Sequence, residues 1–128
     1  MPLVNTAHIL HLVRSSSYCI GAFNIVDYLT LEAVVRSAKR QNAPAIIQTS
    51  SGTAKRYTPA ALVEWSRRLA DQYDAQICLH LDHGTEPGLI QAAIYSKPPK
   101  SIRAIKTSRI HAKTMNRRHL TLYRASGQ

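Results

Sequence analysis

Short apolar runs of strand length alternate with segments of helical periodicity over residues 18–94. The apolar runs lie at 18–25, 45–49 and 77–81, and each is followed by a stretch in which apolar residues recur every three or four positions. Strands that are joined through helical crossovers must run parallel. With a further helix at the start, this order predicts an α/β fold, and both a doubly wound sheet and a barrel fit it.

Capping and stop residues mark the ends of the expected helices. Thr6 caps a first short helix, and Asn42 and Pro44 stop a second helix over 29–41. Thr58 caps a third helix with Pro59 at its first position, and Thr85 caps a fourth that runs to about residue 94. The polar residues 50–53 predict a loop after the second strand. Because the runs are almost continuously apolar, we expect strands that are buried on both faces.

The length of 128 residues limits the architecture to one ordinary domain, because a complete (β/α)₈ barrel needs about 200 to 250 residues. The two cysteines, Cys19 and Cys78, lie within apolar strands, and we interpret them as reduced, inert core thiols. No apolar run reaches the roughly 18 residues of a membrane span, and the N-terminus does not resemble a secretory signal. We therefore expect a cytoplasmic protein.

Charge changes abruptly after Ile94. Residues 1–94 contain all seven acidic residues and eight of the 17 basic ones, whereas residues 95–128 contain nine basic residues and no acid. This predicts a domain over 1–94 and a basic tail over 95–128 that is disordered, irregular or weakly helical. Three origins for the tail stay open: an arm for nucleic acid or another anionic surface, a solvated extension, or a frameshifted sequence. The abrupt loss of every acid favours the frameshift.

Polar residues stand where each expected strand ends. They are Asn24 after the first strand, Ser50, Ser51 and Gly52 after the second, and His80, Asp82 and His83 at the third. In parallel α/β folds function gathers at these ends. An aspartate there can act as a general acid or base, and a histidine can bind a metal. From the residues alone, a helix cap or a hydrogen-bonded pair is the commoner explanation of the Asp-His pair, and a polar turn that of residues 50–52.

Four segments together resemble one enzyme family. MPLVNT, GAFNI, APAIIQTSSG and LHLDHGT occur in the order and spacing of the opening of class II, zinc-dependent ketose-bisphosphate aldolases, of the fructose- and tagatose-bisphosphate type. The resemblance covers residues 1 to about 94. It implies a (β/α)₈ TIM barrel, of which this chain holds the N-terminal part: a leading helix and three of eight units. It also implies reversible aldol cleavage of a ketose bisphosphate to dihydroxyacetone phosphate and glyceraldehyde 3-phosphate, in carbohydrate metabolism and glycolysis.

The resemblance implies roles for four residues. Asp82 corresponds to the catalytic proton donor and acceptor, and His83 to the first zinc ligand. Asn24 and Ser50 correspond to contacts with the dihydroxyacetone phosphate part of the substrate. Zinc is the implied cofactor, acting as a Lewis acid on the ketone. Family members are usually homo-oligomeric.

The resemblance ends where the charge changes. In residues 95–128 we find no family motif, no further zinc-binding histidine of the family and no glycine-rich phosphate loop. We therefore expect the 128-residue chain to be inactive by itself, with an unpaired edge on its third strand. The alternative is a non-enzymatic α/β module that uses its basic tail to bind nucleic acid or a partner chain. With Tyr95 and Tyr123 as the tail's aromatic residues, base stacking would be poor, so nucleic acid is not the expected partner.

Overall fold

The structure is a computed structural model that describes residues 3–14, 17–96 and 119–121. Its elements are α1 (Thr6–Val13), β1 (Gly21–Ile25), α2 (Tyr28–Arg40), β2 (Ala45–Ser50), α3 (Ser51–Tyr57), α4 (Pro59–Tyr73), β3 (Ile77–Asp82), α5 (Pro87–Tyr95) and β4 (His119–Thr121). The strands form one sheet in the order β1-β2-β3-β4, in which β1, β2 and β3 are parallel and β4 is antiparallel to β3. The predicted α/β class is confirmed.

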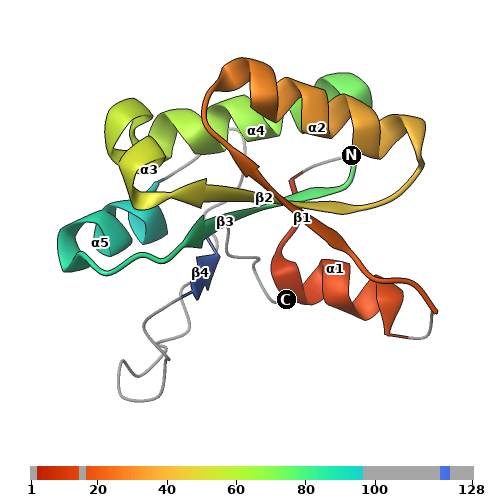
Figure 1. Ribbon diagram of the computed structural model, residues 1–128, viewed down its shortest axis with the longest axis horizontal. Helices are drawn as coiled ribbons and strands as arrows, with labels where there is room; N and C mark the ends of the chain where they lie inside the picture. The colour runs from red at the N-terminus through yellow and green to blue at the C-terminus, as the bar shows by residue number, and fades with distance from the viewer. Residues whose placement is uncertain (1–2, 15–16, 97–118, 122–128) are drawn as a thin grey trace.

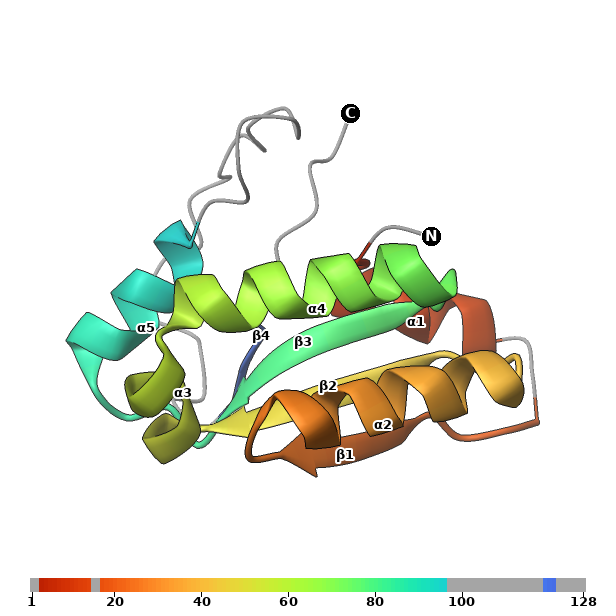
Figure 2. The ribbon, with the colours of Figure 1, turned by 90° about the horizontal axis from the view of Figure 1, so that it is seen from above.

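Helices lie on both faces of the sheet, as Figure 1 and Figure 2 show. Helices α2 and α4 cover one face, and the core between them and the sheet contains the fully buried side chains of Leu31, Leu62 and Leu79. Helix α1 lies across the opposite face, where its Thr6 Oγ1 is 3.1 Å from Cys78 Sγ of β3. The sheet therefore has a helix-covered outer face and an inner face that α1 covers at one end.

One of the four predicted helix starts is confirmed, and three shift by a residue, including that of α2, which begins at Tyr28 rather than at residue 29. Thr58 caps α4, with Pro59 at the first position, and its hydroxyl accepts a hydrogen bond from the N–H of Ala61. Helix α1 is capped by Asn5 rather than Thr6, and α5 begins after Glu86 rather than Thr85. These shifts are small because neighbouring polar residues compete for the same capping position.

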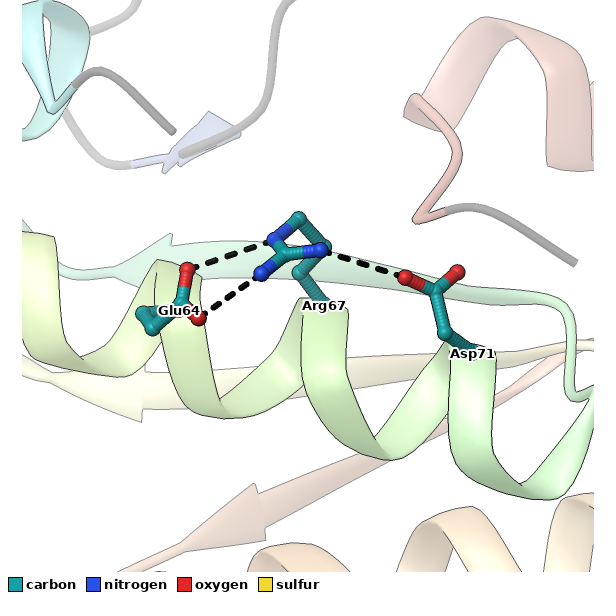
Figure 3. A network of polar contacts seen from close by, with 3 residues as sticks. All are labelled: Glu64, Arg67 and Asp71. Atoms are coloured by element: carbon teal, nitrogen blue, oxygen red, sulfur yellow. Dashed lines mark hydrogen bonds and ion pairs between the residues drawn. The ribbon is translucent and has the colours of Figure 1, made fainter. Parts of the chain in front are cut away.

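The exposed side of α4 carries a network of ion pairs (Figure 3). The guanidinium of Arg67 donates to both carboxylate oxygens of Glu64, at 2.7 and 3.2 Å, and to Asp71 Oδ2 at 3.3 Å. The hydrogen bonds with Glu64 raise the pKa of Arg67. Because these groups are partly exposed, we assign the network about 0.5 kcal/mol of helix stability.

Strand β1 is mostly exposed, so the prediction that it is buried on both faces was wrong. Of its five residues, only Ile25 is buried, and the Phe23 side chain is 48% exposed. The physical reason is that β1 is an edge strand that pairs only with β2 in the described part of the chain. Cys19, just before this strand, is exposed as well, whereas Cys78 is buried as predicted.

The polar residues 50–53 form the start of a helix rather than a loop. Ser50 is the N-cap of α3, and its Oγ accepts a hydrogen bond from the N–H of Thr53 at 3.2 Å. Small polar residues favour turns and helix N-caps for the same reason, namely their short hydrogen-bonding side chains. Composition alone therefore could not separate the two.

The edge of β3 is paired over its last three residues, which corrects the expected unpaired edge. Strand β4 lies antiparallel beside 80–82, in a part of the tail that we expected to be irregular or weakly helical. An open strand edge presents unpaired N–H and C=O groups, and an extended segment of the same chain can satisfy them. The rest of the predicted tail, with its proposed disorder and nucleic-acid arm, lies outside the described residues apart from 95–96. No helix in the described ranges is long and apolar enough to cross a membrane.

Candidate functional site

The carboxyl ends of β1, β2 and β3 bring the predicted site residues to one edge of the sheet. In the register of the strands, Ser50 stands opposite Asp82, and Asn24 stands opposite Gln48, which in turn stands opposite His80. Residues opposite one another share a face of the sheet. His80 and Asp82 also share a face with Cys78, because side chains two positions apart in a strand point the same way, and Cys78 contacts α1. These residues therefore lie on the inner face, away from the core under α2 and α4.

Gln48 is a member of this row that the sequence reasoning missed. It lies between Asn24 and His80 and is half-buried. The signal that could have found it is strand alternation, since it stands two residues before Ser50 on the same face.

The Asp82 carboxylate lies between two imidazoles. Its Oδ1 is 4.0 Å from His80 Nε2 and 3.7 Å from His83 Nε2. The Asp82 side chain is only 17% exposed, whereas that of His83 is 71% exposed. Both distances are longer than a hydrogen bond but bring the carboxylate and the two rings together at one strand end.

His83 is placed by a tight turn after β3. Its φ of 52° is in the left-handed region, and its carbonyl oxygen accepts a hydrogen bond from Ser51 Oγ at 3.3 Å. The next residue, Gly84, is buried, and a Cβ there would lie 2.9 Å from Leu81 Cδ2. The turn therefore requires the small residue and presents the His83 ring to solvent.

The two residues predicted to contact substrate, Asn24 and Ser50, differ in whether their side chains already make hydrogen bonds within the described structure. Asn24 is exposed at the end of β1. The Ser50 hydroxyl caps α3 and donates a hydrogen bond to Thr53 Oγ1 at 3.2 Å. Ser50 must therefore exchange its contact with Thr53 before its hydroxyl can donate to a ligand.

The described residues do not form a complete metal centre. A catalytic zinc usually has three protein ligands. Within the described ranges, no group of three or more His, Cys, Asp or Glu side chains is placed to hold a metal ion. His83 offers one exposed imidazole, so its role as a zinc ligand stays a prediction, and no reaction step is derived through a metal.

Two hollows lie away from the strand ends. One, of about 450 Å³, is at the amino ends of β2 and β3 and is lined in part by Lys39 and Asp74, which form an ion pair at 3.0 Å. The other, of about 330 Å³, is apolar and runs beside β1, where Phe23 and Val34 line it. Neither is lined by any of the strand-end residues.

Sequence comparison identifies relatives with known activity. Residues 4–106 match the family model of class-II fructose-bisphosphate aldolases, so the match extends past the change of charge at Ile94. A fructose-bisphosphate aldolase of Helicobacter pylori is 34% identical over 84 residues, which are 65% of this chain and 27% of that protein. The plasmid fructose-bisphosphate aldolase of Cupriavidus necator is 31% identical over 97 residues, 75% of this chain and 28% of that protein. The chain thus spans a little over a quarter of the length of these relatives.

Solved structures share the fold. The YdjI aldolase of Escherichia coli K12 matches with a TM-score of 0.64 at 20% identity, over 74% of this chain and 37% of that one. A Coccidioides immitis protein assigned as a fructose-1,6-biphosphate aldolase matches with a TM-score of 0.61 at 26% identity, over 69% and 33%. The predicted architecture, an N-terminal part of a TIM barrel, is confirmed by this likeness.

Proposed function

Because this chain belongs to the class-II fructose-bisphosphate aldolase family, we propose that its strand ends form part of an aldolase active site. The reaction is the reversible cleavage of fructose or tagatose bisphosphate to dihydroxyacetone phosphate and glyceraldehyde 3-phosphate. The observation that carries the proposal is the Asp82–His83 pair at the carboxyl end of β3, whose side chains are 3.7 Å apart. The carboxyl ends of barrel strands are where catalytic residues of this fold gather.

Asp82 is the group that we assign to proton transfer. Its side chain is only 17% exposed at a strand end, and the imidazoles of His80 and His83 lie 4.0 and 3.7 Å from its Oδ1. A carboxylate in such a position can take a proton from a substrate carbon or hydroxyl and return it. Aldol cleavage and its reverse need one such transfer in each direction.

Asn24 and Ser50 are the residues that we assign to the dihydroxyacetone phosphate part of the substrate. Both lie on the inner face at the same edge as Asp82, and Ser50 is its direct register neighbour. An amide and a hydroxyl supply hydrogen bonds to the ketone, hydroxyl or phosphate oxygens of such a substrate. His83 is the one residue of this proposal that we assign as a zinc ligand.

We expect no aldolase turnover by the 128-residue chain itself. The described residues supply fewer donors than a catalytic zinc requires. The chain also spans only 27% and 28% of the two curated relatives. Its site is therefore tested by binding rather than by rate.

The test is an NMR titration of the full chain with Zn²⁺ and with dihydroxyacetone phosphate. Zinc should shift the ring signals of His83, and the shift should vanish in His83→Ala but persist in His8→Ala, since His8 is an exposed histidine on α1. Dihydroxyacetone phosphate should shift the amide signals of Asn24, Ser50 and Asp82.

Inorganic phosphate at the same concentration is the control, because the basic residues of the chain attract any phosphate. The proposal fails if His83→Ala leaves the zinc response unchanged. It also fails if dihydroxyacetone phosphate and inorganic phosphate shift the same amides by the same amount.

A further inference from the structure

The last strand of the described chain lies against the strand that carries the candidate site. In the antiparallel register, Thr121 stands opposite His80, Leu120 opposite Leu81 and His119 opposite Asp82. The other side of β3 pairs with β2 along its whole length. Over 80–82, β3 is therefore an interior strand, although it is the third of only three parallel strands.

This pairing uses the edge along which the parallel sheet would continue. Backbone N–H and C=O groups of a strand point alternately to its two sides, and each side bonds one neighbour. An edge that is occupied by β4 cannot bond a further parallel strand. The two solved structures that share this fold are covered by this chain over only 37% and 33% of their length.

The two sides of the parallel sheet therefore differ: β1 has no further strand beside it among the described residues, whereas β3 is paired with β4 (Figure 1). Strand β1 is exposed at one edge, and residues 18–26 around it contain no charged residue and no proline. Charges and prolines are the usual protection against pairing between chains. At the opposite edge, β4 covers β3 over 80–82, so the outermost described strand is only three residues long, and a very short edge strand is another such protection.

We propose that β4 is an intramolecular strap that closes the β3 edge and excludes any other strand from it. The strap is only three residues long, and each backbone hydrogen bond contributes little net stability, so it opens reversibly. While closed, it denies the β3 edge to another chain; when open, it exposes the backbone beside His80 and Asp82. The inference rests on backbone pairing and holds whether or not Asp82 transfers protons.

The test replaces the strap without changing charge. In H119G/L120P/T121G, glycine and proline remove the strand propensity of β4. The matched control, T114G/M115P/N116G, alters the same number of residues elsewhere in the tail. Neither variant changes a Lys, Arg, Asp or Glu residue.

Hydrogen exchange and sedimentation velocity provide the readouts. We expect backbone amides of 80–82 that face β4 to exchange at least tenfold faster in the strap variant than in the wild type and the control. Amides of Ile46 and Ile47, which lie in β2, should keep their wild-type rates and show that the sheet is intact. The strap variant should also self-associate at lower protein concentration than the control, since the six-residue edge of β3 then replaces the three-residue edge of β4.

Equal exchange at 80–82 in all three proteins would overturn the proposal. Faster exchange without stronger self-association would overturn its blocking role. If the triple variant loses protection across the whole sheet, the milder Leu120→Gly variant gives the same test. Its acceleration should then be confined to 80–82, and unchanged exchange there would equally contradict the strap.

Discussion

Asp82 Oδ1 lies 3.7 Å from His83 Nε2, although neighbouring residues of a regular strand project to opposite faces. The two groups are close because the chain turns at His83, where φ is 52°. A left-handed conformation costs a residue with a Cβ about 1–2 kcal/mol. Strain of this kind persists at functional sites when the surrounding structure holds it. The pair is therefore a product of the turn rather than of the strand.

The strain at His83 predicts an order of stability among variants. His83→Gly removes the Cβ and should raise the free energy of unfolding by about 1 kcal/mol relative to His83→Ala. Both variants lose the imidazole, so the comparison isolates the backbone. Urea unfolding followed by circular dichroism measures the difference, and equal midpoints for the two variants would contradict a strained turn.

Gly84 is predicted to be intolerant of a side chain. A Cβ there would meet Leu81 Cδ2 at 2.9 Å, and Leu81 is fully buried in the core. We expect Gly84→Ala to lower the free energy of unfolding by about 1–3 kcal/mol. Gly88→Ala is the matched control, because no atom lies within 4 Å of its Cβ position and alanine favours a helix. A Gly84→Ala protein as stable as Gly88→Ala would refute the close packing of this turn.

The two cysteines should differ in reactivity. Burial raises the pKa of the Cys78 thiol, which lies under α1 with Thr6 Oγ1 at 3.1 Å. Cys19 is exposed. Iodoacetamide should therefore modify Cys19 in the native chain at least tenfold faster than Cys78, because the thiolate is the reactive form. Peptide mass spectrometry measures both rates, and in denaturant they should become similar. Rapid modification of Cys78 in the native chain would mean that α1 does not cover the inner face.

Asp27 should make stability depend on pH. The N–H of Thr30 donates to Asp27 Oδ1 at 2.8 Å, and this bond, together with one from the Thr30 hydroxyl, lowers the pKa of Asp27. Because the folded pKa is below the unfolded value of about 3.9, the contribution of Asp27 is complete above that pH and is lost as pH falls through the folded pKa.

Asp27→Asn keeps a capping oxygen but cannot titrate. The difference in urea midpoint between wild type and Asp27→Asn should be constant from pH 7 to about pH 5 and shrink below about pH 4. A difference that stays constant down to pH 2.5 would show that Asp27 does not titrate with a lowered pKa.

Much of the fold follows from local patterns in the sequence. The period of apolar residues placed β2, β3, α2 and α4 within a residue or two, because burial of these elements imposes that period. The exposed face of β1 could not be predicted in this way. An apolar run indicates a strand that is suited to burial, but whether a neighbour covers it depends on residues far away in the sequence or outside the chain.

In the candidate site, too, some features follow from local sequence patterns and others depend on the folded structure. Strand alternation was enough to place His80 and Asp82 on one face, and register then set Ser50 beside Asp82. The approach of His83 depends on a left-handed turn, and β4 depends on a pairing between residues nearly forty positions apart. Neither leaves a periodic signal in the sequence, so both had to come from the structure.

The most direct test of the account is a chimeric enzyme. In the Helicobacter pylori fructose-bisphosphate aldolase, the 84 aligned residues are replaced by those of this chain, and cleavage of fructose bisphosphate is measured. We predict a folded, active chimera whose kcat falls by about 100-fold or more when Asp82 is changed to asparagine. A folded chimera without activity, or one whose kcat is unaffected by Asp82→Asn, would contradict an aldolase site at these strand ends.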